Sequence, residues 1–168
     1  MKPVREGNIN MLPIKEYFGT VLFTEEQRKR FRSGELVKEW SRTYKEIFDK
    51  DDIRLAVDQN SYHFFEWLAA IVIYNTTGYL SLVEKYKFTN HVRKQEILPK
   101  LFFSDKIITK ICSSRVPDLL CYRPDFKDCF FCEVKGLRDK MRSVQKERFR
   151  ELKRLTGKEI YLIEFKKK

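Results

Sequence analysis

Two carboxylates and a lysine stand at a spacing that could support hydrolysis of a phosphodiester bond. Fourteen residues separate Asp118 from Glu133, and Lys135 follows two positions later. Residues two apart in a strand point to the same face, so Glu133 and Lys135 are expected to project together. If the two apolar stretches pair as a hairpin, Asp118 lies beside them near the strand ends. The sequence therefore predicts two carboxylates and one ammonium on one surface of a sheet.

Such a cluster suits a hard divalent cation. Two neighbouring carboxylates repel each other unless a cation lies between them, and Mg²⁺ satisfies both while it keeps several waters. The ion withdraws charge from phosphoryl oxygens and lowers the pKa of a bound water. Lys135 would then orient or activate the attacking water and stabilise the developing negative charge. The side chain of Val134 is expected to point into the core, which makes its carbonyl oxygen a candidate further ligand.

A purely structural explanation exists for each of these residues. Asp118 could serve a turn after Pro117, and Glu133 with Lys135 could form an ion pair on a solvated strand. Against this, the segment CFFCEVK that contains them is apolar on both faces, which indicates a central strand. Charged side chains in that position are costly without a partner or a metal.

The elements around the cluster predict a mixed α/β core. Its strands are expected at residues 117–122, 129–135 and 159–165, with a polar turn at 123–128. A helix over about 141–155, ended by Gly157, would carry the chain to the last strand. Its expected buried stripe comprises Met141, Val144, Phe149, Leu152 and Leu155.

The N-terminal part of the chain has a different pattern. The first 57 residues are predicted to be helical, and a helix that is apolar nearly all round is expected from Ser61 to about Asn75. Glu66 within that buried helix is a candidate metal ligand that His63 could orient. The alternative places Glu66 on a narrow exposed edge of the helix. Residues 85–103 are predicted to form a further, charged helix.

The charge balance indicates a polyanionic partner. The chain has 168 residues and a net charge of +11, from 35 Lys and Arg against 24 Asp and Glu. Residues 135–168 hold 13 basic and 5 acidic side chains, which places +8 of the net charge there. Nucleic acid is the first expectation and an anionic membrane surface the second. The sequence has no 18-residue apolar run and no signal-peptide pattern, so an intracellular protein is expected, cytoplasmic or, in a eukaryote, nuclear.

Cys129 and Cys132 form a CxxC pair that could suggest zinc. Residues three apart on a strand point to opposite faces, however, so both thiols are not expected to reach one ion. The four cysteines are interpreted as reduced thiols that serve as small core residues.

The motif resembles that of a known nuclease superfamily. Pro117-Asp118 followed by Glu133-Val134-Lys135 is similar to the PD-(D/E)xK signature, and the continuation through Gly136, Asp139 and Gln145 resembles its VRR-NUC branch. The resemblance implies Asp118, Glu133 and the Val134 carbonyl as metal ligands. It implies Lys135 as the catalytic lysine and Gln145 as a residue near the scissile phosphate. The branch often has Ser three residues before that Gln, where this chain has Arg142.

The resemblance also implies a fold and an activity. The expected fold is a restriction-endonuclease-like α/β core, with a central mixed β-sheet flanked by helices, over residues 58–168. Residues 1–57 would add an N-terminal helical extension. The expected activity is Mg²⁺- or Mn²⁺-dependent endonucleolytic cleavage of DNA. By analogy with the family, the expected substrate is branched or flapped DNA. The residues predicted to contact the nucleic acid are Arg93, Lys94, Arg138, Lys140, Arg142 and Lys146.

Three other functions compete with this expectation. A non-catalytic nucleic-acid-binding module could keep the same fold, although binding alone needs basic residues and not paired acids. An RNA-processing nuclease could use the same metal chemistry. A membrane-surface role is the weakest, because no basic amphipathic helix with exposed aromatic residues stands out. An enzyme that cuts four-way junctions would need two sites and hence a homodimer, which the sequence neither requires nor excludes.

Overall fold

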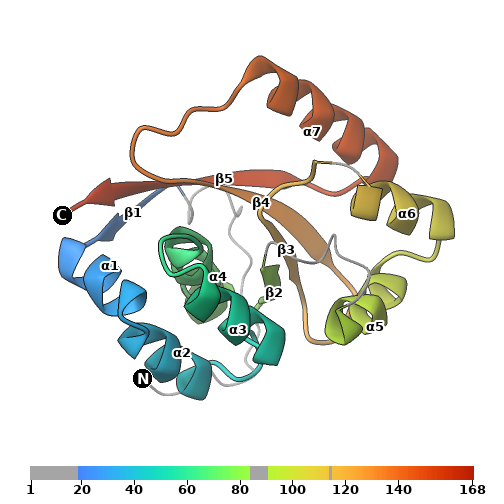
Figure 1. Cartoon of the computed structure of the whole chain (residues 1–168). Helices are drawn as coiled ribbons and strands as arrows, with labels where there is room; N and C mark the ends of the chain where they lie inside the picture. Colours follow the sequence, from blue (N-terminus) through green and yellow to red (C-terminus); the bar gives the residue numbers. More distant parts are fainter. Residues whose placement is uncertain (1–18, 84–90, 114) are drawn as a thin grey trace.

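The computed structural model describes residues 19–83, 91–113 and 115–168. One mixed five-stranded sheet lies between two layers of helices, in the strand order β1-β5-β4-β3-β2 (Figure 1). The elements in chain order are β1 (Thr20–Phe23), α1 (Glu25–Arg32), α2 (Glu35–Thr43), α3 (Lys50–Asp58), α4 (Phe64–Thr77), β2 (Leu80–Val83), α5 (Val92–Leu101), α6 (Asp105–Ser113), β3 (Leu119–Tyr122), β4 (Cys129–Lys135), α7 (Ser143–Thr156) and β5 (Ile160–Lys167).

The strand β4 occupies the middle of the sheet. It pairs antiparallel with β3 and parallel with β5, and α7 makes the crossover between the two parallel strands. β2 extends the sheet beyond β3, and β1 pairs parallel with β5 at the other edge. The prediction of a mixed α/β core whose last strand is reached through a helix is therefore confirmed.

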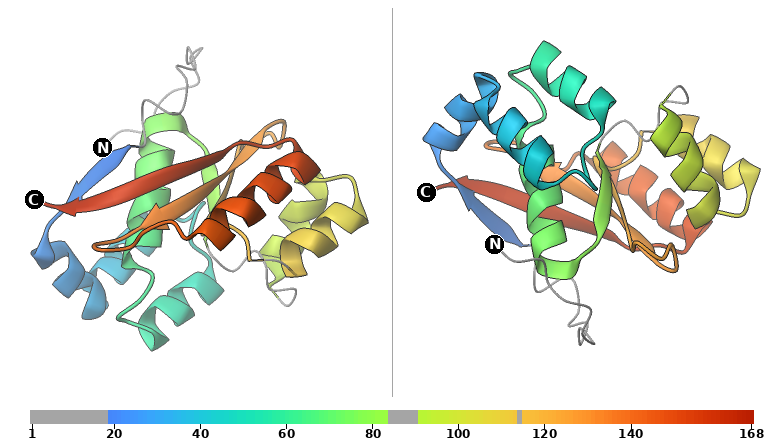
Figure 2. Two further views of the ribbon diagram at one scale, coloured as in Figure 1. Left: turned by 90° about the horizontal axis from the view of Figure 1, so that it is seen from above. Right: turned by 90° about the horizontal axis from the view of Figure 1, so that it is seen from below.

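Two hydrophobic cores lie on the two faces of this sheet. α1 to α4 cover one face, and α5, α6 and α7 cover part of the other (Figure 2). Along β4 the side chains alternate between these cores: Phe130, Cys132 and Val134 belong to the first, and Cys129 and Phe131 to the second. This alternation confirms that β4 is apolar on both faces, as a central strand must be when helices cover both of its sides.

α4 is the helix around which the first core is built. Trp67, Ala69, Ala70 and Ile73 are completely buried, because the sheet lies on one side of α4 and the helices α1 to α3 on the other. Phe48 stacks on Trp67 with ring centroids 3.7 Å apart. The helix ends where Gly78 adopts a φ of 76°, which glycine tolerates without strain. The prediction of a buried helix ended by Gly78 is confirmed, with the start at Phe64 instead of Ser61.

The prediction that the first 57 residues are helical is wrong for β1, and its residues 1–18 lie outside the described part. Val21 and Phe23 pack into the first core while the backbone of β1 pairs with β5. Helices α1 to α3 bury their apolar residues in the same core as α4, so the core does not divide at residue 57. Four residues are too few for a periodicity to distinguish a strand from a helix.

Three further differences concern the remaining helices and strands. β2 and α6 were not anticipated. A helix was expected over residues 85–103. The structure has α5 within this range, and residues 85–90 lie outside the described part. In α7, Phe149 and Leu152 are buried, but Val144 is 56% exposed. Val144 precedes Phe149 by five residues, which places it about 140° away around the helix.

Within the described residues, no helix is long and apolar enough to cross a membrane.

Candidate active site beside the end of the central strand

Asp118 lies at the bend directly before β3, beside the C-terminal end of β4. The β3–β4 register pairs Leu119 with Cys132, so the next position along places Asp118 opposite Glu133. The Oδ2 atom of Asp118 accepts a hydrogen bond of 2.8 Å from the backbone N–H of Val134. The expected approach of Asp118 to the second strand is therefore confirmed.

Glu133 and Lys135 project to the same face of β4, and their side chains meet. The Lys135 ammonium donates to Oε1 of Glu133 over 2.7 Å, and the two side chains are only 12% and 6% exposed. A nearly buried carboxylate is costly unless charged or polar donors compensate it. Lys135 supplies a charged donor to this carboxylate.

Gln145 supplies a second donor to Glu133. It lies in the first turn of α7, and its Nε2 donates to the same Oε1 atom over 3.1 Å. Its own Oε1 accepts from the backbone N–H of Arg142, the N-cap residue of α7, over 3.2 Å. Both ends of the Gln145 amide are thus hydrogen-bonded. The N-terminus of α7, which is the positive end of its dipole, lies beside the Glu133 carboxylate.

Val134 lies between Glu133 and Lys135 in the sequence, and its backbone N–H points toward Asp118. Its side chain is buried in the first core, whereas its N–H points at the Asp118 carboxylate. The N–H and C=O of one strand residue point to the same neighbouring strand, so the Val134 carbonyl is directed to that side as well. The position opposite Val134 is Pro117, which has no N–H to donate to this carbonyl.

The chain leaves the site at Gly136, where a side chain would meet a packed ring. A Cβ atom on Gly136 would lie 2.7 Å and 2.9 Å from two ring carbons of Phe65 on α4. Two residues later Arg138 adopts a left-handed φ of 68°, and the segment then reaches α7. A side chain at position 136 would therefore force the Phe65 ring or the β4–α7 corner to shift.

These donors fit a hard divalent cation. The predicted ligands Asp118, Glu133 and the Val134 carbonyl offer oxygen atoms, which Mg²⁺ and Mn²⁺ prefer. Lys135 and Gln145 both contact Oε1 of Glu133, so Oε2 is the oxygen that would face a cation. Within the described ranges, no three His, Cys, Asp or Glu side chains group as metal ligands. The fit therefore rests on two carboxylates, one backbone carbonyl and water.

Glu66 belongs to another layer of the protein. It lies half-buried in the first turn of α4, which covers the Val134 face of β4, whereas Glu133 and Lys135 project to the opposite face. The structure therefore does not bring Glu66 together with Glu133 and Lys135 on one face. His63 directs its Nε2 to Oε1 of Gln59 over 2.8 Å.

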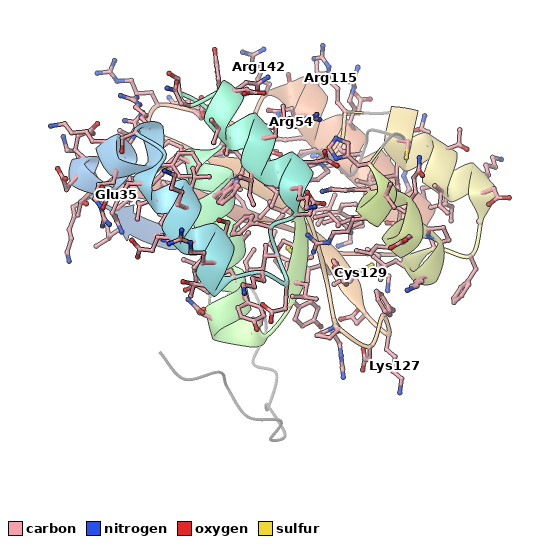
Figure 3. The ribbon with its side chains drawn as sticks, turned by 60° about the horizontal axis from the view of Figure 1, so that its bottom comes forward. Glu35, Arg54, Arg115, Lys127, Cys129 and Arg142 are labelled. Atoms are coloured by element: carbon pink, nitrogen blue, oxygen red, sulfur yellow. The ribbon has the colours of Figure 1, made fainter. Side chains whose placement is uncertain are left out.

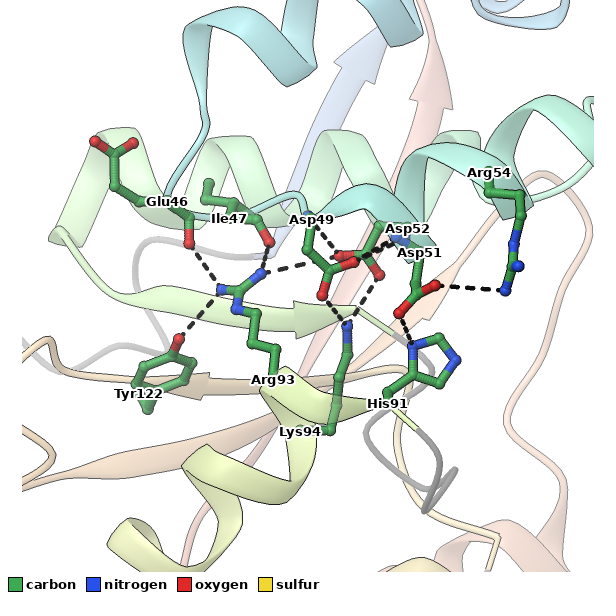
Figure 4. Close-up of polar contacts among 10 residues, drawn as sticks. All are labelled: Glu46, Ile47, Asp49, Asp51, Asp52, Arg54, His91, Arg93, Lys94 and Tyr122. Atoms are coloured by element: carbon green, nitrogen blue, oxygen red, sulfur yellow. Dashed lines mark hydrogen bonds and ion pairs between the residues drawn. The ribbon is translucent and has the colours of Figure 1, made fainter.

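Lys94 is not available to nucleic acid, so its predicted role is wrong. Its side chain is completely buried, and its ammonium lies 3.1 Å from Oδ2 of Asp49 and 3.2 Å from Oδ1 of Asp52 (Figure 4). Arg93 beside it donates to the backbone carbonyls of Glu46 and Ile47. These two cations hold α5 against the start of α3, and the guanidinium of Arg93 is committed to protein contacts.

The other four predicted contacts are exposed. Arg138, Lys140, Arg142 and Lys146 lie on the segment between β4 and α7 and on the first turns of α7. Arg142 points outward from the body of the protein, at the opposite end of the view from the turn residue Lys127 (Figure 3). Their role in nucleic-acid binding stays a prediction.

Glu164 on β5 is a neighbour of the site that the sequence did not indicate. The parallel β4–β5 register pairs it with Lys135, and both project to the face opposite Ile163 and Phe165. The alternation of β5 shows which face Glu164 occupies, but only the register shows which residue it lies beside.

The thiols of Cys129 and Cys132 lie in different cores, on opposite faces of β4. The prediction that this pair cannot reach one ion is confirmed. All four cysteines are free thiols.

Comparison of the chain with protein-family models, curated proteins and solved structures found no match.

Proposed function

We propose that this chain is a nuclease that hydrolyses phosphodiester bonds of DNA. One observation carries the proposal: Lys135 and Gln145, from different elements, converge on a single oxygen of Glu133, while Asp118 bonds to the intervening Val134. A structural ion pair would need only Glu133 and Lys135. A second carboxylate and an oriented amide at the same strand end support a reaction centre in place of a lone ion pair.

Each side chain has a defined role in this proposal. The ammonium of Lys135 would orient the attacking water and stabilise the developing negative charge on the phosphate. Gln145 donates to the Glu133 carboxylate and would present its amide beside the scissile group. The Val134 carbonyl is directed to the side on which Asp118 lies, and together they complete the oxygen donors. Mg²⁺ or Mn²⁺ held by Asp118, Glu133 and the Val134 carbonyl would withdraw charge from the phosphoryl oxygens and lower the pKa of a bound water.

The finer architecture belongs to the same proposal. The sheet with α4 on one face and α7 on the other supports a restriction-endonuclease-like core, to which β1 and α1 to α3 are added. Branched or flapped DNA is the proposed substrate form, by analogy with the VRR-NUC branch. Cleavage of a four-way junction would require two sites and therefore a homodimer.

The proposal is tested by cleavage of labelled single-stranded, duplex, flap and four-way-junction DNA with Mg²⁺, Mn²⁺ or EDTA. Asp118→Asn and Lys135→Ala are expected to lower the cleavage rate at least about 100-fold, because each removes charge that acts in the transition state. In Asp118→Asn the new amide oxygen can still accept from the Val134 N–H, so folding should be retained. Lys127→Ala, on the distant β3–β4 turn, is the matched control and should cleave as the wild type does.

Two outcomes would contradict the proposal and assign the chain another function. Tight, salt-sensitive DNA binding without cleavage under any metal would assign the chain to non-catalytic binding modules. Cleavage of an RNA version of the same substrate, with the DNA version left intact, would assign it to RNA processing.

A further inference from the structure

The exposed side of α7 carries three cations spaced four residues apart. Lys146 and Arg150 lie on α7, and Arg142 is its N-cap residue; all three are exposed, and positions four apart lie close together along a helix. Phe149 and Leu152 mark the side of α7 that faces the core. The three cations therefore form a row, here called the α7 stripe, along one flank of the helix.

The α7 stripe lies on the flank that faces away from α6. Glu151 marks the α6 side, because it forms a 3.4 Å ion pair with Lys110 of that helix. At about 100° per residue, Lys146 and Glu151 lie about 140° apart around the axis. The α6 flank also carries Glu147, so its charge is balanced by acids from its own helix.

The charge of the α7 stripe is not neutralised within the described part of the protein. None of its three side chains forms an ion pair with a described residue, whereas Lys153 of the same helix is bound to Glu159 over 2.8 Å. Unpaired cations in a row repel one another, and a polyanion removes that repulsion when it binds.

The stripe also begins at the candidate site. Gln145, which bonds to Glu133, lies between Arg142 and Lys146 in the sequence. From Arg142 to Arg150 the helix rises by about 12 Å, which at about 3.4 Å per nucleotide covers roughly three to four nucleotides of a duplex strand.

We infer that the α7 stripe is the track for the phosphodiester backbone of one nucleic-acid strand that leads away from the scissile bond. This inference rests on the proposed nuclease function. The occupant is a strand of roughly three to four nucleotides on one side of the cut, held through its phosphates and not through its bases. The substrate class is therefore a strand with continuous backbone beyond the scissile phosphate, bound independently of sequence.

Binding in EDTA tests the track separately from cleavage. The full chain is titrated against fluorescein-labelled 20-nucleotide single strands and duplexes of two unrelated sequences, over a series of salt concentrations. The triple variant Arg142→Gln, Lys146→Gln, Arg150→Gln is expected to bind at least about tenfold more weakly at low salt. Its slope of log affinity against log salt should fall by about 2 for single strands and about 3 for duplexes. Both sequences should show the same loss.

The matched control removes two arginines from the same helix outside the stripe. At about 100° per residue, Arg154 lies about 120° around the axis from Arg142. It lines the groove between α6 and α7, beside Lys106 and Glu151. The variant Arg148→Gln, Arg154→Gln should therefore leave the affinity and the salt slope nearly unchanged.

Two results in these titrations would overturn the inference. If the control variant loses binding and the triple variant does not, the strand binds along the groove between α6 and α7 instead of the α7 stripe. Preferential binding of phosphatidylserine vesicles over oligonucleotides would favour a membrane surface as the occupant of the stripe.

Substrate length gives a second, independent readout. If the track exists, shortening the strand from four nucleotides to one on the α7 side of the cut should weaken binding to the wild type and have little effect on the triple variant. Equal loss in both proteins would contradict the track. Loss of binding in the triple variant, together with no metal-dependent cleavage by the wild type, would keep the track and reject the nuclease.

Discussion

At the scale of single residues, the same chemistry serves two purposes in this chain. Lys94 and Lys135 are both lysines beside carboxylates. Lys94 is completely buried between Asp49 and Asp52, whereas Lys135 lies in the candidate site beside Glu133 and is 12% exposed. Burial acts to raise the pKa of Asp49, but the backbone N–H of Asp52 and the Lys94 charge outweigh it, so this pKa lies below its ordinary value. The two ion pairs therefore differ in their surroundings: the buried pair is structural, and the pair at Lys135 belongs to the proposed reaction centre.

Lys94→Met should destabilise the protein by about 3–5 kcal/mol, because it removes the ammonium that lies 3.2 Å from the buried carboxylate of Asp52. Urea unfolding should show a lower midpoint with an unchanged m-value. Nucleic-acid affinity of the folded fraction should not change, since the side chain is buried. Lys100→Met, exposed on the same helix, is the control; an equal loss of stability in both variants would contradict a specific role for the buried pair.

At the scale of elements, the corner between β4 and α7 couples the candidate site to α4. At Gly136 the chain passes so close to the ring of Phe65 that a Cβ atom would overlap it. Phe65 in turn packs on Phe23 of β1, with ring centroids 5.1 Å apart. A change at this corner is thus resisted by both a helix and an edge strand.

Gly136→Ala is expected to lower the free energy of unfolding by about 1–3 kcal/mol, because the new methyl group overlaps a packed ring. Thermal or urea unfolding measures this loss. Adding Phe65→Leu should recover part of the stability by removing the ring atoms that the methyl group meets. Gly19→Ala, where a Cβ would meet nothing within 4 Å, should be neutral. If the double variant is no more stable than Gly136→Ala alone, the overlap with Phe65 is not the cause.

At the scale of the whole molecule, one sheet separates two hydrophobic cores, and buried cysteines lie in both of them. Cys121 and Cys132 lie in the α4 core, and Cys129 lies in the core beneath α5 to α7. Burial raises the pKa of Cys121 to about 12 and that of Cys129 to about 11, and it holds the pKa of Cys132 well above its ordinary value. Cys112 on α6 is only partly buried.

Alkylation of the native protein at pH 8 should therefore modify Cys112 first. The other three thiols are inaccessible and remain protonated at that pH, so they should react only when the sheet opens, in both cores at once. Mass spectrometry after timed alkylation, with and without urea, measures this order. Modification of Cys129 in the native state, while Cys121 and Cys132 stay protected, would show that the second core opens independently.

The sequence by itself determined the central part of this protein. The apolar pattern on both faces of residues 129–135 predicts a central strand, and the same-face rule places Glu133 beside Lys135. The turn at 123–128 brings Asp118 to them, because a hairpin returns the chain to its own neighbourhood. These are local relations, in which period and short separation set the geometry.

Only the tertiary structure decided the relations between distant segments. That Thr20–Phe23 forms a strand depends on pairing with β5, more than a hundred residues later. That Lys94 is buried depends on α3 and its N-cap supplying two carboxylates, and that Glu164 neighbours Lys135 depends on the β4–β5 register. Composition marks a lysine as basic, but its surroundings determine whether the charge faces solvent or an aspartate. Those surroundings arise from packing between segments that are far apart in the sequence, and a local sequence pattern does not predict which distant segments will pack together.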